Sequence, residues 1–451
     1  MGTPGEPGTW RCRSGNEGCF PWNVFTIGGV DQRALDYMQL AYLYNSGTST
    51  RMLGGAVNGD LGFKFPSATE NVDIAIGAET RKEALFFRPD IINAVGGAAG
   101  QGGAQPPVEG SYVTTELFAE ARVPLVQDRS GVQDLALELG YRLARYKPEE
   151  QGSQSLNSWK AMASWAPVDG FRLRGGMNRA VRAPNIQELF APQSIGLGGS
   201  EDICAGPTPT ATREQCANTG VSSAQYGNIL ENPAGQYNSL DGGNPLLSPE
   251  TADTLTFGIV WTPRSISGLS ITADYYDIEI TNTIDDFNPD DVIKKCAEQG
   301  DPDLCALIQR DALGTLWLTP DGFTESTNQN IGLVSTRGID VSAAYPWRVG
   351  GHGFVTFSFL GSAMFENLLD NPLVNYDCVG FTGNQCGIPA PKWRHRMRAS
   401  WNTNFKTTLT LGWRYIAGVE NDDFSDDPDL ANEGLRERLA LNNSDRIPAF
   451  H

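Results

Sequence analysis

The residue types that most often carry out chemistry are too sparse and too scattered here to predict an active site. Among 451 residues there are three histidines, His352, His395 and His451. Nucleophilic catalysis needs a base within hydrogen-bond reach of a nucleophile, and the spacing indicates no Ser/His/Asp arrangement. The eight cysteines include no C-x-x-C pair, the spacing typical of zinc sites. The sequence therefore predicts no enzyme activity, no metal site and no cofactor.

The cysteines instead form four pairs that are close in sequence. An even number of cysteines that fall into local pairs is typical of disulfides made in an oxidising compartment. The alternative is that they are reduced surface thiols. We expect each pair to be bridged, which would stabilise its loop by about 2–4 kcal/mol. The pairs are Cys12–Cys19, Cys204–Cys216, Cys296–Cys305 and Cys378–Cys386.

A second group of chemically capable residues, the arginines, occurs in segments where polar and apolar residues alternate. In residues 135–144 (LALELGYRLA), Glu138 and Arg142 share one set of alternate positions, and the other set is apolar. Such alternation predicts a strand with one wet face. These arginines either guide an anionic ligand or pair with Glu116 and Glu138, and pairing is favoured. The wet-face candidates are Arg142, Arg172, Arg174, Arg394, Arg396, Arg398 and Arg414.

About twelve segments have this pattern, and many exceed the five or six residues of ordinary strands. Membrane-spanning strands need about 9–11 residues. The segments are 55–65, 71–88, 112–126, 133–147, 155–166, 170–181, 250–262, 268–284, 328–347, 353–366, 392–402 and 406–420.

The connections between these segments alternate between short and long. An antiparallel meander places all long connections at one end, an asymmetry typical of outer-membrane barrels with long extracellular loops. The cysteine pairs lie in long connections or before the first strand, which gives the same polarity. The long extracellular loops are 89–111, 182–249, 285–327 and 367–391.

Aromatic residues and overall composition agree with a membrane barrel. Tyrosine and tryptophan gather at membrane interfaces, so aromatics beside the short turns predict a girdle. A net charge of −19 argues against nucleic-acid binding. Mean hydropathy is only −0.30, as expected when strands face lipid with alternate residues. The girdle residues are Trp165, Trp261, Tyr345, Trp347 and Trp401.

The chain divides into three parts by these criteria. Residues 1–54 are predicted to be an extracellular segment with a short helix near 31–43, and residues 55–420 to form the barrel strands and their loops. Residues 421–451 are predicted to form an acidic extracellular loop leading to a truncated strand. Helical spacing also occurs at 289–299 and 302–309, inside a long loop.

Three stretches together resemble the TonB-dependent outer-membrane receptors. Residues 178–192 (NRAVRAPNIQELFAP) resemble that family's R-A-P-x-x-x-E-L-F segment, and residues 244–259 (NPLLSPETADTLTFGI) its N-P-x-L-x-P-E motif. Residues 330–345 (NIGLVSTRGIDVSAAY) resemble its strand with a central R-G-I-[ED]. The three stretches occur in the family's order, and the resemblance extends from about residue 50 to the C-terminus.

The motif residues have physical roles of their own. Pro184 and Pro249 interrupt strand pairing at a loop's entry and exit. Glu188 and Glu250 are expected to bind loop backbone or to pair with Arg179 or Arg182, and Gly338 to allow a bend or a close approach. The motif positions are Arg182, Ala183, Pro184, Glu188, Leu189, Asn244, Pro245, Pro249, Glu250, Arg337, Gly338 and Asp340.

The resemblance implies a barrel of about 22 strands, with a plug in its lumen. The wet-face arginines are expected to pair with that plug as well as with Glu116 and Glu138. It also implies uptake of a ferric siderophore, cobalamin or oligosaccharide, with TonB acting on the plug. No plug, TonB box or signal peptide is recognisable, so we expect a section of an all-β, antiparallel transmembrane barrel from the outer membrane of a Gram-negative cell. The alternatives are a porin-like channel closed by these strands alone and, less favoured, a soluble sandwich. The expected partners are the TonB complex, outer-membrane lipid and an unknown nutrient ligand, with no nucleic acid.

Overall fold

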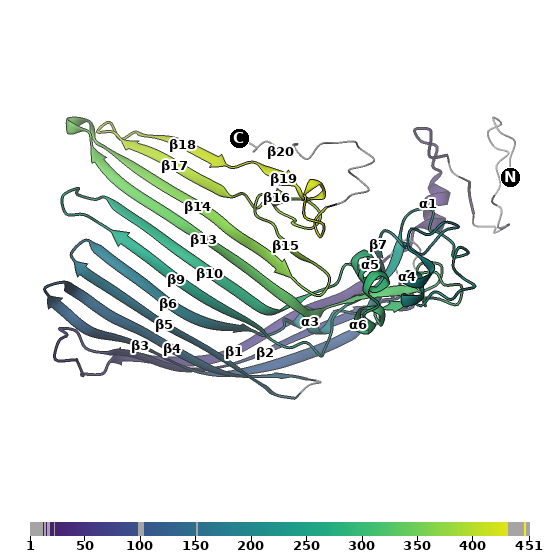
Figure 1. Cartoon of the computed structure of the whole chain (residues 1–451), viewed down its shortest axis with the longest axis horizontal. Helices are drawn as coiled ribbons and strands as arrows, with labels where there is room; N and C mark the ends of the chain where they lie inside the picture. Colours follow the sequence, from purple (N-terminus) through teal and green to yellow (C-terminus); the bar gives the residue numbers. More distant parts are fainter. Residues whose placement is uncertain are drawn as a thin grey trace.

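The computed structural model describes residues 12, 15, 19–21, 23–97, 103–149 and 152–431, and the backbone of residues 446–447. A single antiparallel meander dominates it, and all twelve predicted strands are present (Figure 1). In order across the sheet they are β1 (Tyr44–Asp60), β2 (Asp73–Pro89), β3 (Val108–Arg129), β4 (Val132–Pro148), β5 (Gln154–Val168), β6 (Phe171–Arg182), β9 (Glu250–Trp261), β10 (Ser270–Asp285), β13 (Gln329–Arg348), β14 (Phe354–Asp370), β17 (Trp393–Asn402) and β18 (Thr408–Ile416).

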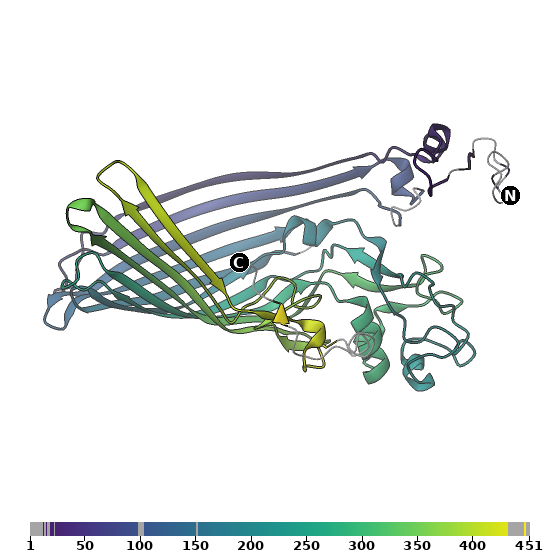
Figure 2. The same cartoon turned by 90° about the horizontal axis from the view of Figure 1, so that it is seen from above.

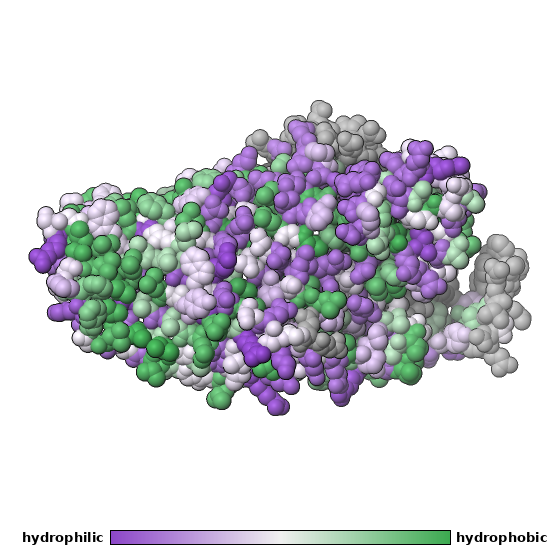
Figure 3. All heavy atoms as spheres, turned by 60° about the horizontal axis from the view of Figure 1, so that its bottom comes forward, coloured by the Kyte–Doolittle hydropathy of each residue, from purple (hydrophilic) through white to green (hydrophobic). Residues whose placement is uncertain are grey.

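The register of the meander gives the sheet two chemically different faces. On β4, Leu139, Tyr141 and Leu143 share one face and are exposed, whereas Arg142 lies on the other. The same division continues through each paired strand, because directly opposed residues point to the same side. Apolar residues gather over the end of the molecule that carries the short turns (Figure 3). The fold is therefore an antiparallel transmembrane β-barrel meander, as predicted.

The described sheet is curved and open. Figures 1 and 2 show strands running from hairpin turns at one end to long loops at the other. Within the described residues, β1 pairs only with β2, and β18 only with β17. A channel closed by these strands alone would need β1 and β18 to pair, and that pairing is absent from the described part.

The short turns carry the predicted aromatic residues on the apolar face. The indole N–H of Trp165 donates to Gly131 O (3.2 Å), and that of Trp401 donates to His352 O (3.1 Å). The 3₁₀ turn η1 (Gly350–His352) forms one of these hairpin ends. Each indole thus has an apolar body toward the lipid-facing side and a polar edge bonded to a turn, as an interface position requires.

The long loops form their own small structure beyond the meander. A four-stranded sheet has the order β11 (Ile308–Gln309), β12 (Phe323–Thr327), β8 (Tyr237–Gly242) and β7 (Ser194–Gly199). A further sheet joins β16 (Phe381–Thr382), β19 (Val419–Asn421) and β20 (Arg446–Ile447), and β15 (Asn375–Asp377) extends β14. The helical segments are α1 (Gln32–Met38), α2 (Ile91–Ala94), α3 (Ile186–Phe190), α4 (Arg213–Asn218), α5 (Pro289–Gln299), α6 (Pro302–Cys305) and the 3₁₀ turn η2 (Asp422–Phe424).

All four predicted disulfides are formed, and three of them lie in this loop assembly. Cys204, Cys216 and Cys296 are fully buried. Cys296 and Cys378 share one apolar cluster with Leu373 and Tyr376, so the loops have a hydrophobic core outside the sheet. Among the described residues, no helix is long and apolar enough to cross a membrane.

The N-terminal boundary and two predicted helices were wrong, and the ends of the strands other than β1 differ from the prediction by at most four residues. Residues 44–54, assigned to the N-terminal loop segment, belong to β1, because the backbone pairs with β2 along its whole length, from Tyr44 opposite Pro89 to Asp60 opposite Asp73. The alternating pattern is weak there because small and polar residues occupy both faces, but ladder hydrogen bonds need no apolar side chains.

The other two differences are shorter helices. The segment 31–43 is helical only over α1, whose N-cap Asp31 accepts a hydrogen bond from Arg33 N. The segment 302–309 is helical only over α6, after which Ile308 and Gln309 pair with β12. Beyond Ala431, the predicted acidic loop and truncated strand lie outside the described residues, apart from the backbone of β20.

Candidate functional site

Ion pairs cross the polar face of the sheet over glycines. Arg174 on β6 donates two hydrogen bonds to Asp274 on β10 (2.9 and 2.7 Å), although β9 lies between them. The pair passes over Gly258, where a Cβ atom would lie 2.0 Å from Asp274 Oδ1. Lys160 reaches Glu120 in the same way across Gly140 (2.8 Å). The glycines give long side chains room to lie flat across a neighbouring strand.

Two more of the predicted wet-face arginines are paired. Arg142 contacts Glu116 (2.6 Å), the partner expected from the sequence, and Arg172 contacts Asp134 (2.8 Å). With Arg174, three of the seven arginines therefore have a carboxylate partner. Glu138, the other partner expected from the sequence, forms no ion pair within the described part of the chain.

The other four arginines lie together on β17 and β18. Arg394, Arg396, Arg398 and Arg414 form no ion pair within 4.0 Å in the part of the chain that the structure describes. Arg396 and Arg414 are directly opposed in the ladder, so two like charges face each other. Such a pair costs roughly 0.2–1 kcal/mol unless an anion lies nearby. We call these four residues the arginine cluster.

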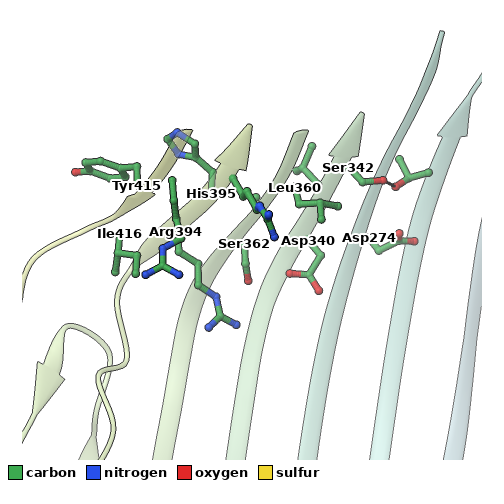
Figure 4. A pocket seen from close by; sticks show the side chains of 14 residues that line it. Asp274, Asp340, Ser342, Leu360, Ser362, Arg394, His395, Tyr415 and Ile416 are labelled. Atoms are coloured by element: carbon green, nitrogen blue, oxygen red, sulfur yellow. Dashed lines mark hydrogen bonds between the residues drawn. The ribbon is translucent and has the colours of Figure 1, made fainter. Parts of the chain in front are cut away.

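Three residues of the arginine cluster, Arg394, Arg396 and Arg414, border a hollow of about 530 Å³ along the polar face. The register places Asp274, Asp340, Ser362 and Arg394 in one row across four strands. Figure 4 shows Arg394, Ser362 and Asp340 on the same side of the strands. Adjacent guanidinium groups beside hydroxyl donors can bind an anion through charge-assisted hydrogen bonds.

Arg182 organises the first two family-like motifs. It lies at the end of β6 and contacts Glu188 (2.9 Å) and Glu250, which begins β9. Glu188 also accepts from Asn185 N, completing a capping box on α3, and Glu250 accepts from Ile284 N (2.8 Å). Arg179 pairs instead with Asp253. Both carboxylates therefore bind an arginine and a backbone N–H group. These contacts hold the start of the loop after β6 next to its end, where β9 begins.

The remaining residues of these motifs hold α3 against the sheet. Leu189 is 1% exposed and packs with Tyr146, while Ala183 lies at the edge of the same cluster. Asn244 donates to Asn328 O (3.0 Å), and the Tyr146 hydroxyl donates to Pro184 O (3.3 Å). Pro245 and Pro249 lie in the segment that leads into β9.

The third motif lies mid-sheet. The Tyr276 hydroxyl is 2.5 Å from where a Cβ on Gly338 would be, and the ladder shifts register between Arg337 and Gly338. Gly338 thus allows both a bulge and a close approach. Arg337 pairs with Glu366 (2.5 Å) on the outward face, whereas Asp340 faces the hollow.

Several important groups in the loops were not recognised from the sequence. Arg310 and Asp202 form an ion pair with both side chains buried. Burial alone would raise the pKa of Asp311, but hydrogen bonds from Thr315 lower that pKa on balance. Asp422, from the acidic run, is fully buried and accepts from Gln385 N and Cys386 N. Aspartate is common in turns, where its side chain accepts hydrogen bonds from backbone N–H groups, but only the fold reveals which backbone it binds.

Comparisons with known proteins are consistent with this geometry. The family model described as TonB dependent receptor-like, beta-barrel matches residues 10–450. Among solved structures, the ferric enterobactin receptor (PfeA) of Pseudomonas aeruginosa is similar at 15% identity and a TM-score of 0.52, over 83% of this chain and 43% of that one. The siderophore receptor PirA from Acinetobacter baumannii is similar at 13% identity and a TM-score of 0.50, over 84% and 49%.

The chain therefore spans less than half the length of these receptors, and at such identities the likeness concerns the fold. A search of curated proteins found no match.

Proposed function

The chain belongs to the TonB-dependent receptor β-barrel family, and from that premise we propose that it forms wall and outer loops of an outer-membrane receptor for an anionic, scarce nutrient. The observation that carries this proposal is the arginine cluster on the polar face. Of its four guanidinium groups without carboxylate partners among the described residues, three (Arg394, Arg396 and Arg414) border one hollow of about 530 Å³. We infer a ferric siderophore, since oligosaccharides and cobalamin lack a comparable negative charge.

The structural neighbours support this choice of ligand class. The solved receptors of similar fold are named for ferric enterobactin and for a siderophore. A negatively charged iron chelate needs donors that offset its desolvation, and arginine supplies a planar set of them. Active uptake further implies TonB as the energising partner, acting through a plug in the lumen.

The test compares binding of ferric enterobactin with binding of cobalamin, using the protein extracted from outer membranes. The variant carries Arg394→Gln, Arg396→Gln, Arg398→Gln and Arg414→Gln. We expect its dissociation constant for ferric enterobactin to rise at least about tenfold, equivalent to about 1.4 kcal/mol. Removing the Arg396–Arg414 repulsion leaves the barrel at least as stable, which heat-modifiable migration on a gel checks.

The matched control removes a paired charge from the same face. Arg142→Gln combined with Glu116→Gln deletes an existing ion pair on β4 and β3. We expect that variant to bind as the parent does. Unchanged ferric enterobactin affinity in the cluster variant, or an equal loss in the control, would contradict an anion-binding role for the arginine cluster.

A further inference from the structure

The outward face of the sheet changes from apolar to basic toward the loop end of the first four strands. Along β4 the outward residues are Leu139, Tyr141 and Leu143, followed by Arg145 and Lys147. Leu143 is 46% exposed, so this face has no protein cover in the described part of the chain. An exposed apolar band below a polar margin is the arrangement of a lipid-facing barrel wall.

Neighbouring strands add two cations to this margin. The ladder places Arg51 on β1 opposite Lys82 on β2, Lys82 opposite Val113 on β3, and Val113 opposite Lys147 on β4. Arg145 lies two positions from Lys147 on the same face. We call Arg51, Lys82, Arg145 and Lys147 the outward basic patch.

The four cations of the outward basic patch are exposed and lack acidic partners. None has a carboxylate within 4.0 Å among the described residues. The carboxylates of this margin are engaged elsewhere. Glu109 pairs with Arg88, and Glu149 accepts from the Ser111 hydroxyl (2.8 Å). A local excess of positive charge therefore stands out in a chain whose net charge is −19.

Outward arginines elsewhere along the same margin are neutralised. Arg179 on β6 contacts Asp253 on β9 (2.7 Å), and Arg337 on β13 contacts Glu366 on β14 (2.5 Å). Both lie on the loop side of an outward apolar run, as Arg145 does. The unpaired charge is thus confined to β1–β4 and is not a general property of the margin.

We propose that the outward basic patch binds the phosphate groups of a phosphorylated glycolipid in the membrane leaflet on the loop side. Arginine and lysine at the edge of a lipid-facing band destabilise a barrel little, because they lie near the membrane interface. There they attract anionic lipid headgroups. Leu53, Leu117 and Leu143, all exposed, lie directly below the patch on the same face. Acyl chains contact this apolar surface while the phosphates bind the cations above it. The inference rests on the proposed membrane orientation, but not on the arginine cluster in the lumen.

The test is native mass spectrometry of the protein extracted from outer membranes, titrated with diphosphorylated lipid A. The variant carries Arg51→Gln, Lys82→Gln, Arg145→Gln and Lys147→Gln. We expect lipid A affinity to fall roughly tenfold or more, since each cation near an anionic headgroup contributes. Dephosphorylated lipid A is expected to bind weakly to parent and variant alike, and added salt to weaken the parent's binding.

Two control variants separate local binding from general charge and folding. Arg179→Gln with Asp253→Asn removes a neutralised pair at the same margin, and its lipid A affinity should match the parent's. Lys82→Arg with Lys147→Arg keeps the charge and should retain binding. Ferric enterobactin affinity, which depends on the opposite face, should be unchanged in every variant and reports that each is folded.

Equal lipid A affinity in parent and patch variant overturns the proposal, as does an equal loss in the neutralised-pair control. If inorganic phosphate at the same concentration displaces lipid A from the parent, the site recognises a free anion and the lipid assignment fails. If the parent protein does not bind ferric enterobactin at all, the proposed function fails. The comparison of lipid A affinity between parent and variants still stands in that case.

Discussion

At the residue scale, the guanidinium of Arg310 joins two long loops that are distant in sequence. It donates both Nη groups to Asp202 (2.7 and 3.0 Å), two bonds to Thr219, and one to Gly314 O (2.9 Å). Every N–H of the group has an acceptor, so a charge that would be costly to bury is fully satisfied. The pair fastens the 183–249 loop to the 286–328 loop.

The Asp202→Asn substitution is expected to loosen these loops. It leaves a buried guanidinium without its counter-charge, a change that costs about 3–5 kcal/mol. Amide hydrogen exchange should show faster opening around 203–220 and 307–316 without a change in the sheet. The control is Arg264→Gln, which breaks an ion pair with Asp169 in an exposed turn and should cost about 0–1 kcal/mol. Equal protection of the loops in Asp202→Asn and the parent would show that Arg310 tolerates the lost charge.

At the element scale, α3 lies on the polar face because a glycine makes room for it. The Phe190 ring packs over Gly110 of β3, where a Cβ would lie 2.3 Å from the ring. Phe190 and Tyr112 are both about 5% exposed and belong to one cluster. The capping box at Asn185 begins the helix, and the Phe190 contact directs it inward over the sheet.

The Gly110→Val substitution should undock α3. An aromatic ring packed against the backbone cannot yield as a flexible side chain does, so overpacking costs about 1–3 kcal/mol. Urea unfolding in detergent and protease cleavage between 183 and 193 measure the effect. Gly412→Val on β18 is the matched control, because a Cβ there meets nothing within 4 Å. A similar loss of stability in both variants would mean that the cost comes from glycine replacement in strands, not from Phe190.

At the scale of the whole molecule, the strands separate two ends of different chemistry. One end has hairpin turns with bonded indoles, and the other has disulfide-linked loops with their own core. Long loops face outward in outer-membrane barrels, so the loop end is predicted to face the exterior. The disulfides are compatible with that side, because they form and persist both in the periplasm and at the cell surface.

Labelling with a membrane-impermeant maleimide tests this orientation. In intact cells, Ser223→Cys in the long loop should react, whereas Ser265→Cys in the turn between β9 and β10 should react only after the outer membrane is permeabilised. Both side chains are exposed, so access depends on which side of the membrane each residue occupies. Reaction of Ser265→Cys alone in intact cells would reverse the assigned polarity.

The sequence by itself determined the twelve strands, the two faces, the turn asymmetry and the four disulfide pairs. These features are local: a period of two is set by the backbone, and cysteines 7 to 12 residues apart meet without help from the rest of the chain. The first part of β1 was not predicted, because residues 44–54 show little alternation of apolar and polar side chains.

Only the tertiary structure decided which charges meet. Arg174 and Asp274 are 100 residues apart, and Arg310 and Asp202 are 108 apart. Their contacts depend on strand register and on loop packing, which no short pattern encodes. The same register left the arginine cluster and the outward basic patch without carboxylate partners on opposite faces of one sheet. A strand's alternation specifies the face on which a charge lies, but only the neighbouring strands specify whether that charge is neutralised.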